Sequence, residues 1–300
     1  MKKLTLAVIA TFLCFYANTK AQTKSFEVLN PKVEQGGVLI IRIASQWQSP
    51  AVFNPAISVF GKHYLPNKHG EVFVGIGIDV KHQRRVVTLV EYGRGIRLGS
   101  DWKVIEIIQK NFTTRTRIPF VPAKKWKQER VVIAKAFDSG DYFEKYFDRN
   151  FISPIDKVAV NQGRMIGSES SPFGGGHNGV DLVTLDPSRK KHNRSVRAIN
   201  SGKVALIAKN YSTEGNMIII DHGSGIFSIY MHLSRFLVKN VGDMVVGGDV
   251  IAMSGNTGNA KKGGPHLHLS IKVRDKSGTS DVYVDPLAFI DTVNSIFNNR

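Results

Sequence analysis

Apolar and polar residues alternate with the two-residue period of β-strands over much of the chain between residues 38 and 108. Gly, Pro and Asn separate the apolar runs at spacings of about ten residues; the runs are VLIIRIA, AISVF, VFVGIGIDV, RRVVTLVEYG and WKVIEII. Short strands with turn residues at such regular spacing are typical of a β-sandwich. We therefore predict a small antiparallel sandwich within residues 22–124.

A second strand-rich stretch lies within residues 156–292 and contains SVRAINSGKVALIAK, NMIIIDHGSGIFSIYMHL, GGDVIAMSG and HLHLSIKV. Residues 217–233 predict a hairpin, because two alternating arms flank the turn HGSG. In the returning arm Ser228, Tyr230 and His232 share one face, and apolar residues share the other. The chain as a whole is therefore predicted to be all-β.

Residues 125–155 connect the two strand-rich units. Four aromatic residues recur there at helical spacing after Ser139, a residue type that favours the start of a helix: Tyr142, Phe143, Tyr146 and Phe147. We expect a helical or extended linker in which these rings lie on one helix, packed between the units.

The first 21 residues predict a secretory signal peptide. Two lysines precede an apolar run from Leu4 to Tyr16, and a small residue, Ala21, stands at the cleavage position of such signals. The run is too short to span a bilayer comfortably. We therefore expect export to the periplasm or the extracellular cell envelope, with no transmembrane anchor in the mature chain.

Composition limits the chemistry of the exported part. Cys14, the one cysteine of the sequence, lies in the signal, so the mature chain has no disulfide, thiolate nucleophile or cysteine metal ligand. Without the three lysines of the signal, the 41 Lys and Arg fall to 38, against 24 Asp and Glu. This charge attracts anionic wall or outer-membrane polysaccharide, or serves solubility alone. The signal and the lack of a nucleic-acid-binding motif argue against nucleic acid as a partner.

The segment GGPHLHLSIKV, residues 263–273, places two histidines one residue apart at the start of an alternating strand. His266 and His268 therefore share one face, while the leucines between and after them face the core. Two imidazoles on one face suit a metal ligand beside a proton-transfer group. His232 has the same arrangement on the returning arm of the hairpin.

The segment GGGHNGVD, residues 174–181, supplies partners for this strand. His177 and Asp181 are close enough along the chain to reach one ion, and the flanking glycines permit close approach of a ligand. Together with the HxH strand, the segment offers the three protein ligands of a catalytic zinc site, whose fourth position is left for water.

These motifs resemble those of the lysostaphin-type (LytM-like) zinc endopeptidases of bacterial peptidoglycan. The HxxxD of residues 177–181, the YMHL that contains His232, the SGNTG loop and the GPHLH strand occur in the order and rough spacing of that family. The resemblance covers roughly residues 160–290.

The resemblance implies two sets of functional residues. Three would bind one Zn²⁺ ion: His177, Asp181 and His268. Two would assist catalysis beside it: His232 and His266. It also implies a LytM-like antiparallel β-sheet peptidase domain over residues 156–292, and the amino-terminal sandwich resembles the immunoglobulin-like module of some exported members.

Zinc held by two imidazoles and a carboxylate lowers the pKa of its water to about 7, which makes hydroxide available for attack on a peptide carbonyl. The chain has no HExxH motif, whose Glu is the general base of other metalloproteases. His232 and His266 are therefore the candidates to move the proton and to stabilise the oxyanion. The sequence leaves open which of them does which.

We predict an exported endopeptidase that hydrolyses peptide bonds in peptidoglycan cross-links or stems by a metal-activated water. Glycine-rich loops at 174–176 and 255–264 would frame an open groove, which suits an extended peptide. The alternative is a non-catalytic LytM-like scaffold that binds cell wall and regulates wall amidases; the presence of all five expected residues argues against it. Glycine-rich cross-bridges and a host protein stay open as other substrates.

Other residues are predicted to stand outside the site. His192, in the basic segment DPSRKKHNR, and His222, in the hairpin turn, lack a strand placement suited to the metal. Three more histidines lack ligand-like spacing and are expected at the surface: His63, His69 and His82. Ser270 stands where many relatives carry Glu or a similar polar group, which affects the expected substrate placement more than metal binding.

Overall fold

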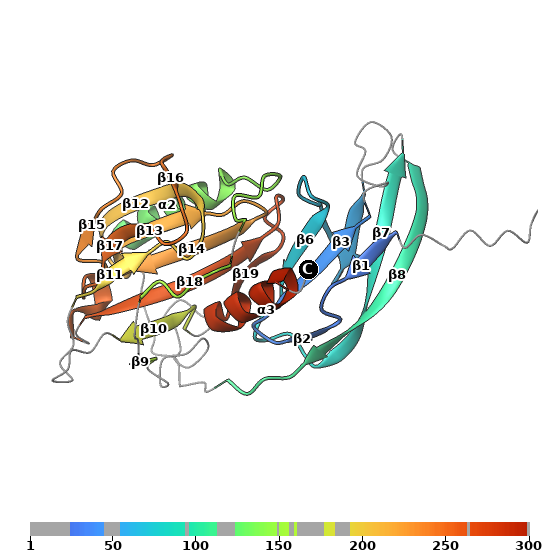
Figure 1. The fold of residues 1–300 in the computed structure, drawn as a ribbon, viewed down its shortest axis with the longest axis horizontal. Coiled ribbons are helices and arrows are strands. Elements are labelled where there is room, and N and C mark those ends of the chain that lie inside the picture. The colour runs from blue at the N-terminus through green and yellow to red at the C-terminus, as the bar shows by residue number, and fades with distance from the viewer. Residues whose placement is uncertain are drawn as a thin grey trace, which may run out of the picture.

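The computed structural model describes residues 25–44, 55–93, 96–112, 124–148, 150–155, 159–160, 177–183, 193–262 and 265–298. The predicted signal peptide, the glycines at 174–176 and His192 lie outside these residues. Two β units lie side by side, and helix α3 (Pro286–Asn298) lies where they meet (Figure 1). Within the described ranges, no helix combines the length and the apolar character needed to cross a membrane.

The first unit is a two-sheet β-sandwich, as the alternation predicts. One sheet has the order β1-β3-β6: β1 (Phe26–Val28), β3 (Val38–Ile43) and β6 (Glu71–Gly75). The other has the order β2-β8-β7-β4-β5: β2 (Lys32–Glu34), β8 (Ile96–Ile108), β7 (Gln83–Gly93), β4 (Ala56–Val59) and β5 (Lys62–Tyr64). All neighbouring strands pair antiparallel except β2 and β8, which are parallel.

Strands β3 and β6 of the sheet β1-β3-β6 are buried on both of their faces. Leu39 and Ile41 of β3 pack into the core of the sandwich, whereas Val38 and Ile40 pack into the core of the second unit. Phe73 of β6 joins them there. A strand with two buried faces needs apolar residues at nearly every position, which explains the sequence VLIIRI of β3.

The second unit is an eight-stranded antiparallel sheet. Seven strands follow the order β16-β12-β13-β14-β18-β10-β9: β16 (Met244–Val245), β12 (Gly202–Tyr211), β13 (Gly215–Asp221), β14 (Ile226–Met231), β18 (His266–Arg274), β10 (Val180–Val183) and β9 (Ala159–Val160). The eighth, β19 (Asp281–Val284), pairs with β18. A three-stranded sheet of order β11-β17-β15 accompanies it: β11 (Ser195–Arg197), β17 (Val250–Met253) and β15 (Arg235–Phe236).

Strand β18 organises this sheet. One of its edges pairs with β14 over residues 268–273. The other edge pairs with β10 over residues 266–269 and then with β19 over residues 271–274. The beginning of β18 thus lies beside β10, and its end lies beside the hairpin to β19.

The predicted hairpin is confirmed as β13 and β14, but its two faces differ from the expectation. Both are buried, because the sheet packs against one apolar cluster on each face. Ser228 and Tyr230, expected on a polar face, are fully buried. They form a hydrogen-bonded chain with the buried His222, whose Nε2 lies 2.8 Å from Ser228 Oγ, which lies 3.0 Å from the Tyr230 hydroxyl.

The connector contains a helix, but not where the aromatic spacing predicts it. Helix α2 (Lys124–Asp138) ends before Ser139, and its buried side chains pack on β12 and β14. The segment 139–147 is not helical, so the predicted helix through its aromatic residues is wrong.

Hydrogen bonds to the second unit replace helical ones in residues 139–147. The Asp141 N–H donates to the Asp221 carboxylate at 2.7 Å, and the Tyr146 N–H donates to the His222 carbonyl at 2.9 Å. The Asp141 carboxylate accepts the N–H groups of Phe143 and Glu144 and so closes a local turn. Contacts with residues distant in sequence therefore override the local spacing.

Helix α3 has sequence signals that strand periodicity does not reveal. Asp285 precedes the helix, and its Oδ1 accepts the Leu287 N–H at 3.0 Å, while Pro286 occupies the first helical position. Phe289 and Val293 of α3 are buried in the same cluster as Val38 and Ile40 of the sandwich. The helix thus binds the two units together.

Replacement of His222 by Gln tests the pH dependence that this buried imidazole gives to folding. Burial lowers its pKa from 6.5 to about 4. Between these values the unfolded chain binds more protons, so the contribution of His222 is complete above pH 6.5 and decreases by about 3 kcal/mol as the pH falls to 4. We expect the free energy of unfolding, measured with urea at pH 7 and pH 4, to decrease by about 3 kcal/mol more in the parent than in His222→Gln.

Asp221 does not confuse this comparison. Burial raises its pKa to about 6, so its effect on stability has the opposite sign, but it is present in both proteins and cancels in the difference. Equal decreases in the parent and the variant would contradict the assignment.

Candidate metal centre

Two neighbouring strands position the predicted ligands. In the antiparallel register of β10 and β18, Asp181 lies directly opposite His268. The residues on either side of them, Val180, Leu182, Leu267 and Leu269, face the apolar core. The alternation of GVDLV and HLHLS therefore directs Asp181 and His268 to the same face of the sheet.

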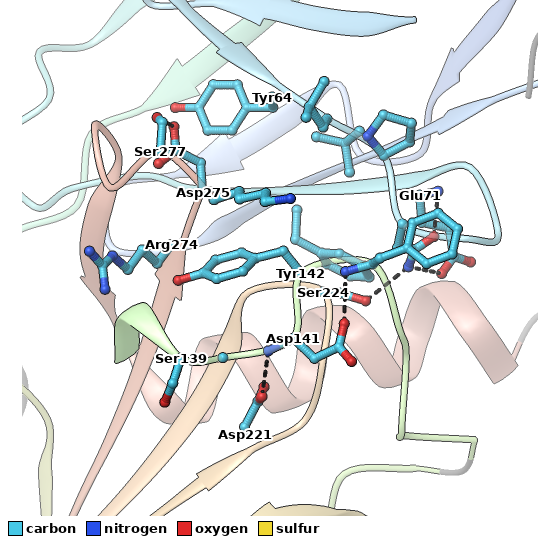
Figure 2. Close-up of a pocket in the computed structure, with 18 of the residues that line it drawn as sticks. Tyr64, Glu71, Ser139, Asp141, Tyr142, Asp221, Ser224, Arg274, Asp275 and Ser277 are labelled. Carbon is cyan, nitrogen blue, oxygen red and sulfur yellow. Dashed lines mark hydrogen bonds between the residues drawn. The ribbon is translucent and has the colours of Figure 1, made fainter. Parts of the chain in front are cut away.

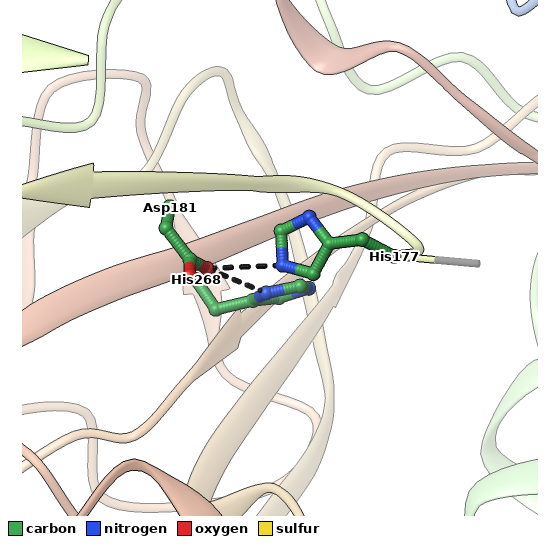
Figure 3. A group of neighbouring side chains, drawn as sticks. All are labelled: His177, Asp181 and His268. Atoms are coloured by element: carbon green, nitrogen blue, oxygen red, sulfur yellow. Dashed lines mark hydrogen bonds and ion pairs between the residues drawn. The ribbon is translucent and has the colours of Figure 1, made fainter. Parts of the chain in front are cut away.

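The ligand atoms of His177, Asp181 and His268 converge (Figure 3). They all lie within 4.8 Å of one another. His177 Nε2 and His268 Nδ1 lie 3.1 Å and 3.0 Å from the same atom, Asp181 Oδ1. Two imidazole nitrogens and one carboxylate oxygen around a common point are a donor set that suits zinc.

The protonation states of this cluster also suit a metal. Burial alone would raise the pKa of Asp181, but hydrogen bonds from His177 and His268 hold it well below its usual range. Burial lowers the pKa of His268. Near neutral pH the cluster therefore holds a carboxylate and a neutral imidazole, as metal ligation requires.

Ser270 orients the His268 ring from the side away from the cluster. Its Oγ lies 2.8 Å from His268 Nε2, and both residues are buried. When the ring proton is on Nε2, it is donated to Ser270, and Nδ1 keeps the lone pair that faces the cluster. Gly179 leaves room for this contact, since a Cβ there would lie 2.7 Å from Ser270 Oγ and 2.1 Å from the Leu269 carbonyl oxygen.

His232 and His266 lie beside the three ligands. The ring centroid of His232 is 5.0 Å from that of His266 and 5.9 Å from that of His268. His266 Nε2 lies 3.7 Å from Asp181 Oδ2. The structure thus brings all five predicted residues together in one cluster.

The backbone of His232 has an unusual conformation. His232 follows β14 and has a φ of 63°. This value lies in the left-handed region, which residues other than glycine rarely adopt. The His232 N–H donates to the Glu214 carbonyl at 2.9 Å, and its Nδ1 lies 3.0 Å from the Thr257 carbonyl oxygen. Burial, followed by the nearby imidazoles of His268 and His266, lowers its pKa to about 3.

Thr257 and Asn216 hold this conformation and were not recognised from the sequence. Thr257 Oγ1 accepts the Asn216 N–H at 2.9 Å and donates to the Leu233 carbonyl at 3.0 Å. The Asn216 side chain donates to the same carbonyl at 2.9 Å. Thr257 belongs to the SGNTG loop, but the contact of its backbone carbonyl with His232 has no sequence signal.

Helix α2 anchors the turn that carries Glu214. Arg130 pairs with the buried Glu214 carboxylate at 2.5 Å, and Glu129 accepts the Ser212 N–H at 3.0 Å. The Lys125 ammonium donates to the Asn210 carbonyl at 2.9 Å. The hydrogen bond from His232 to Glu214 therefore links the cluster to α2.

The other histidines stand apart from the cluster. His222 is buried in the hairpin turn, with Nδ1 on the Ser201 carbonyl and Nε2 on Ser228. Three lie exposed on the sandwich: His63, His69 and His82. Of the glycine-rich loops, residues 255–262 are described and end in the 3₁₀-helix η3 (Gly258–Lys262).

The sequence of this chain is similar to those of known peptidases. The model of peptidase family M23 matches residues 175–286. The peptidoglycan DD-endopeptidase ShyA of Vibrio cholerae is 27% identical over 218 residues, which cover 67% of this chain and 47% of ShyA. Lysostaphin of Staphylococcus simulans is 36% identical over 118 residues, which cover 39% of this chain and 22% of lysostaphin. The chain thus spans less than half of the length of either relative.

A solved structure extends the likeness to the fold. A crystal structure from Pseudomonas aeruginosa, assigned to peptidase M23, matches with a TM-score of 0.53 and 24% identity and covers 85% of this chain and 93% of that one. At this level the likeness shows a shared fold.

Loss of the Ser270 hydroxyl tests the orientation of His268. We expect Ser270→Ala to weaken zinc binding by about tenfold or more, because the neutral ring can then carry its proton on Nδ1. The measurement is the zinc dissociation constant by competition with a coloured chelator. Ser228→Ala is the matched control, since it removes an equally buried Ser–His hydrogen bond, to His222, away from the cluster. Equal zinc affinity in the two variants would refute the role of Ser270.

Proposed function

Because residues 175–286 of this chain belong to peptidase family M23, we propose that the protein is an exported zinc-dependent endopeptidase that hydrolyses peptide bonds in peptidoglycan cross-links or stems. The observation that carries the proposal is the convergence of His177, Asp181 and His268 on one point of the sheet. ShyA, named as a peptidoglycan DD-endopeptidase, supports the substrate class.

The three converging residues are proposed as the zinc ligands. Zinc bound there supplies a Lewis acid and lowers the pKa of a bound water. Asp181 contributes the one negative charge of the set, and the two histidines contribute neutral nitrogen donors. Ser270 and Gly179 keep the His268 ring in place.

His232 is proposed as the general base. A carbonyl oxygen only accepts hydrogen bonds, so the contact with Thr257 holds the ring proton on Nδ1 and leaves the lone pair on Nε2. Nε2 can therefore accept a proton from the attacking water and pass it to the leaving amine. Burial lowers the pKa of His232, so the ring is neutral near neutral pH.

His266 is proposed to stabilise the developing oxyanion. It lies beside His232 on the face of β18 that carries His268. A donor held in place before the reaction lowers the barrier without reorganisation. The Thr257 contact supports this division of roles between His232 and His266.

Location and wall contacts complete the proposal. The predicted signal peptide supports export to the periplasm or the extracellular cell envelope. The excess of Lys and Arg over Asp and Glu supports attraction to anionic wall or outer-membrane polysaccharide.

Metal content and activity of three variants test the assignment. The zinc-loaded parent is expected to release uncross-linked muropeptides from purified sacculi, identified by mass spectrometry. His177→Ala should lose both bound zinc and activity. His232→Ala should keep its zinc while its kcat falls by about 10²–10⁴-fold. The exposed His82→Ala should match the parent in both measurements.

These outcomes separate the enzyme from the scaffold. A parent that binds zinc but releases no muropeptide, and instead stimulates a wall amidase, would establish the non-catalytic alternative. A His232→Ala variant as active as the parent would overturn the base assignment alone.

A further inference from the structure

A cavity of about 1040 Å³ lies where the two β units meet (Figure 2). Its lining includes the β5 hairpin of the sandwich, residues 139–143 of the connector, the beginning of β12, the end of β13, the turn at residues 241–242 and the hairpin between β18 and β19. The volume lies just above the range for small-ligand pockets, about 300–1,000 Å³. The proposed metal centre makes no use of it.

Three exposed apolar side chains border this cavity. They are Leu65 of the sandwich, Phe143 of the connector and Val241 of the second unit, with 59%, 61% and 59% of their surface exposed. They lie far apart in the sequence, so the fold gathers them at one place. Exposed apolar side chains that cluster around a cavity indicate a binding surface.

The carboxylates of the cavity are already engaged within the protein. Asp275 accepts hydrogen bonds from Ser277 and Thr279, and Asp221 accepts the N–H groups of Asp141 and Gly223. The other two carboxylates are engaged in the same way: Glu71 and Asp141. The lining thus has little spare capacity to accept hydrogen bonds.

The cationic groups of the cavity have spare capacity to donate. Arg274 pairs with Asp138 through Nη2 at 2.5 Å, but its buried Nε has no hydrogen-bond partner among the described residues. Lys276 is exposed at the tip of the same hairpin and forms no hydrogen bond or ion pair within the described ranges. Because the Arg274 Nε is shielded from solvent, Lys276 is the free donor that the cavity presents to an anionic ligand.

We propose that this cavity binds a peptidoglycan stem peptide at a site separate from the metal centre. Such a peptide carries free carboxylates, which match Arg274 and Lys276, and short apolar side chains, which match Leu65, Phe143 and Val241. The proposal rests on the proposed function in taking wall peptides as the substrate.

The two sites lie at opposite ends of one strand. His268 is near the beginning of β18 and Arg274 ends it, so six residues separate them, about 20 Å at 3.3 Å per residue. A single small peptide cannot fill both sites, whereas a polymeric wall carries many stems. Binding at the cavity therefore raises the local concentration of cross-links at the metal centre.

Direct binding is measured in a protein that cannot turn over. Soluble uncross-linked muropeptides are titrated by calorimetry into His177→Ala and into the same protein with Lys276→Ala or Phe143→Ala added. Each added substitution should weaken binding by about tenfold, the effect of one charge-assisted hydrogen bond or one buried aromatic contact. Trp102→Ala is the matched control for Phe143→Ala, because both aromatic side chains are 61% exposed and Trp102 lies outside the cavity.

Several outcomes overturn the cavity proposal. It is wrong if the muropeptides do not bind, if the cavity substitutions have no more effect than Trp102→Ala, or if glycan strands freed of peptides bind instead. Unchanged thermal unfolding of the two exposed variants confirms that they fold.

Rates of hydrolysis distinguish a failure of the cavity proposal from a failure of the proposed function. In the zinc-loaded parent background, Lys276→Ala should raise the sacculus concentration for half-maximal rate by about tenfold. Its hydrolysis of a small soluble cross-linked muropeptide should be unchanged. A parent that cleaves neither substrate refutes the enzyme, while the calorimetric result still decides the cavity.

Discussion

The structure depends on the pairing of β10 with β18. Asp181 and His268 meet because their strands pair in one register, and a shift of β10 by one residue would turn Asp181 to the face of the sheet opposite His268. The neighbours Val180, Leu182 and Leu269 prevent such a shift, because each is buried in the apolar core. The core therefore determines where the proposed ligands converge.

This dependence explains how much could be predicted from the sequence. Alternation is a local property, so it revealed the strands of both units and the shared face of His266 and His268. The spacing of His177 and Asp181 in a glycine-rich segment supplied the remaining partners, the resemblance implied the roles, and the structure brings all five residues together. Thr257 could not be predicted, since its carbonyl contacts His232 through a backbone conformation with a φ of 63°. The aromatic spacing of residues 142–147 predicted a helix that does not form, because hydrogen bonds to Asp221 and His222 outweigh the local preference for helix.

The two units predicted from the sequence share one apolar cluster. Val38, Ile40 and Phe73 of the sandwich lie in the same apolar cluster as Phe289 of α3 and the core strands of the second unit. Gly75 of β6 approaches β18 and β19 so closely that a Cβ would lie 2.9 Å from Val282. Separate domains with a mobile linker would expose these side chains to water at a cost of roughly 25 cal/mol per Å² of apolar surface. The position of the sandwich relative to β18 is therefore set by packing, and so is the cavity between them.

Helix α2 contributes to the geometry of the histidine cluster as well. It precedes residues 175–286, the part that matches the family, yet Arg130 and Glu129 anchor the turn whose carbonyl holds His232. Residues other than glycine rarely adopt the left-handed backbone conformation unless surrounding contacts enforce it. The energy that holds His232 in that conformation therefore comes partly from a helix outside the family domain. Within this chain the geometry of the cluster is a property of the connector and the sheet together, rather than of the ligand motifs alone.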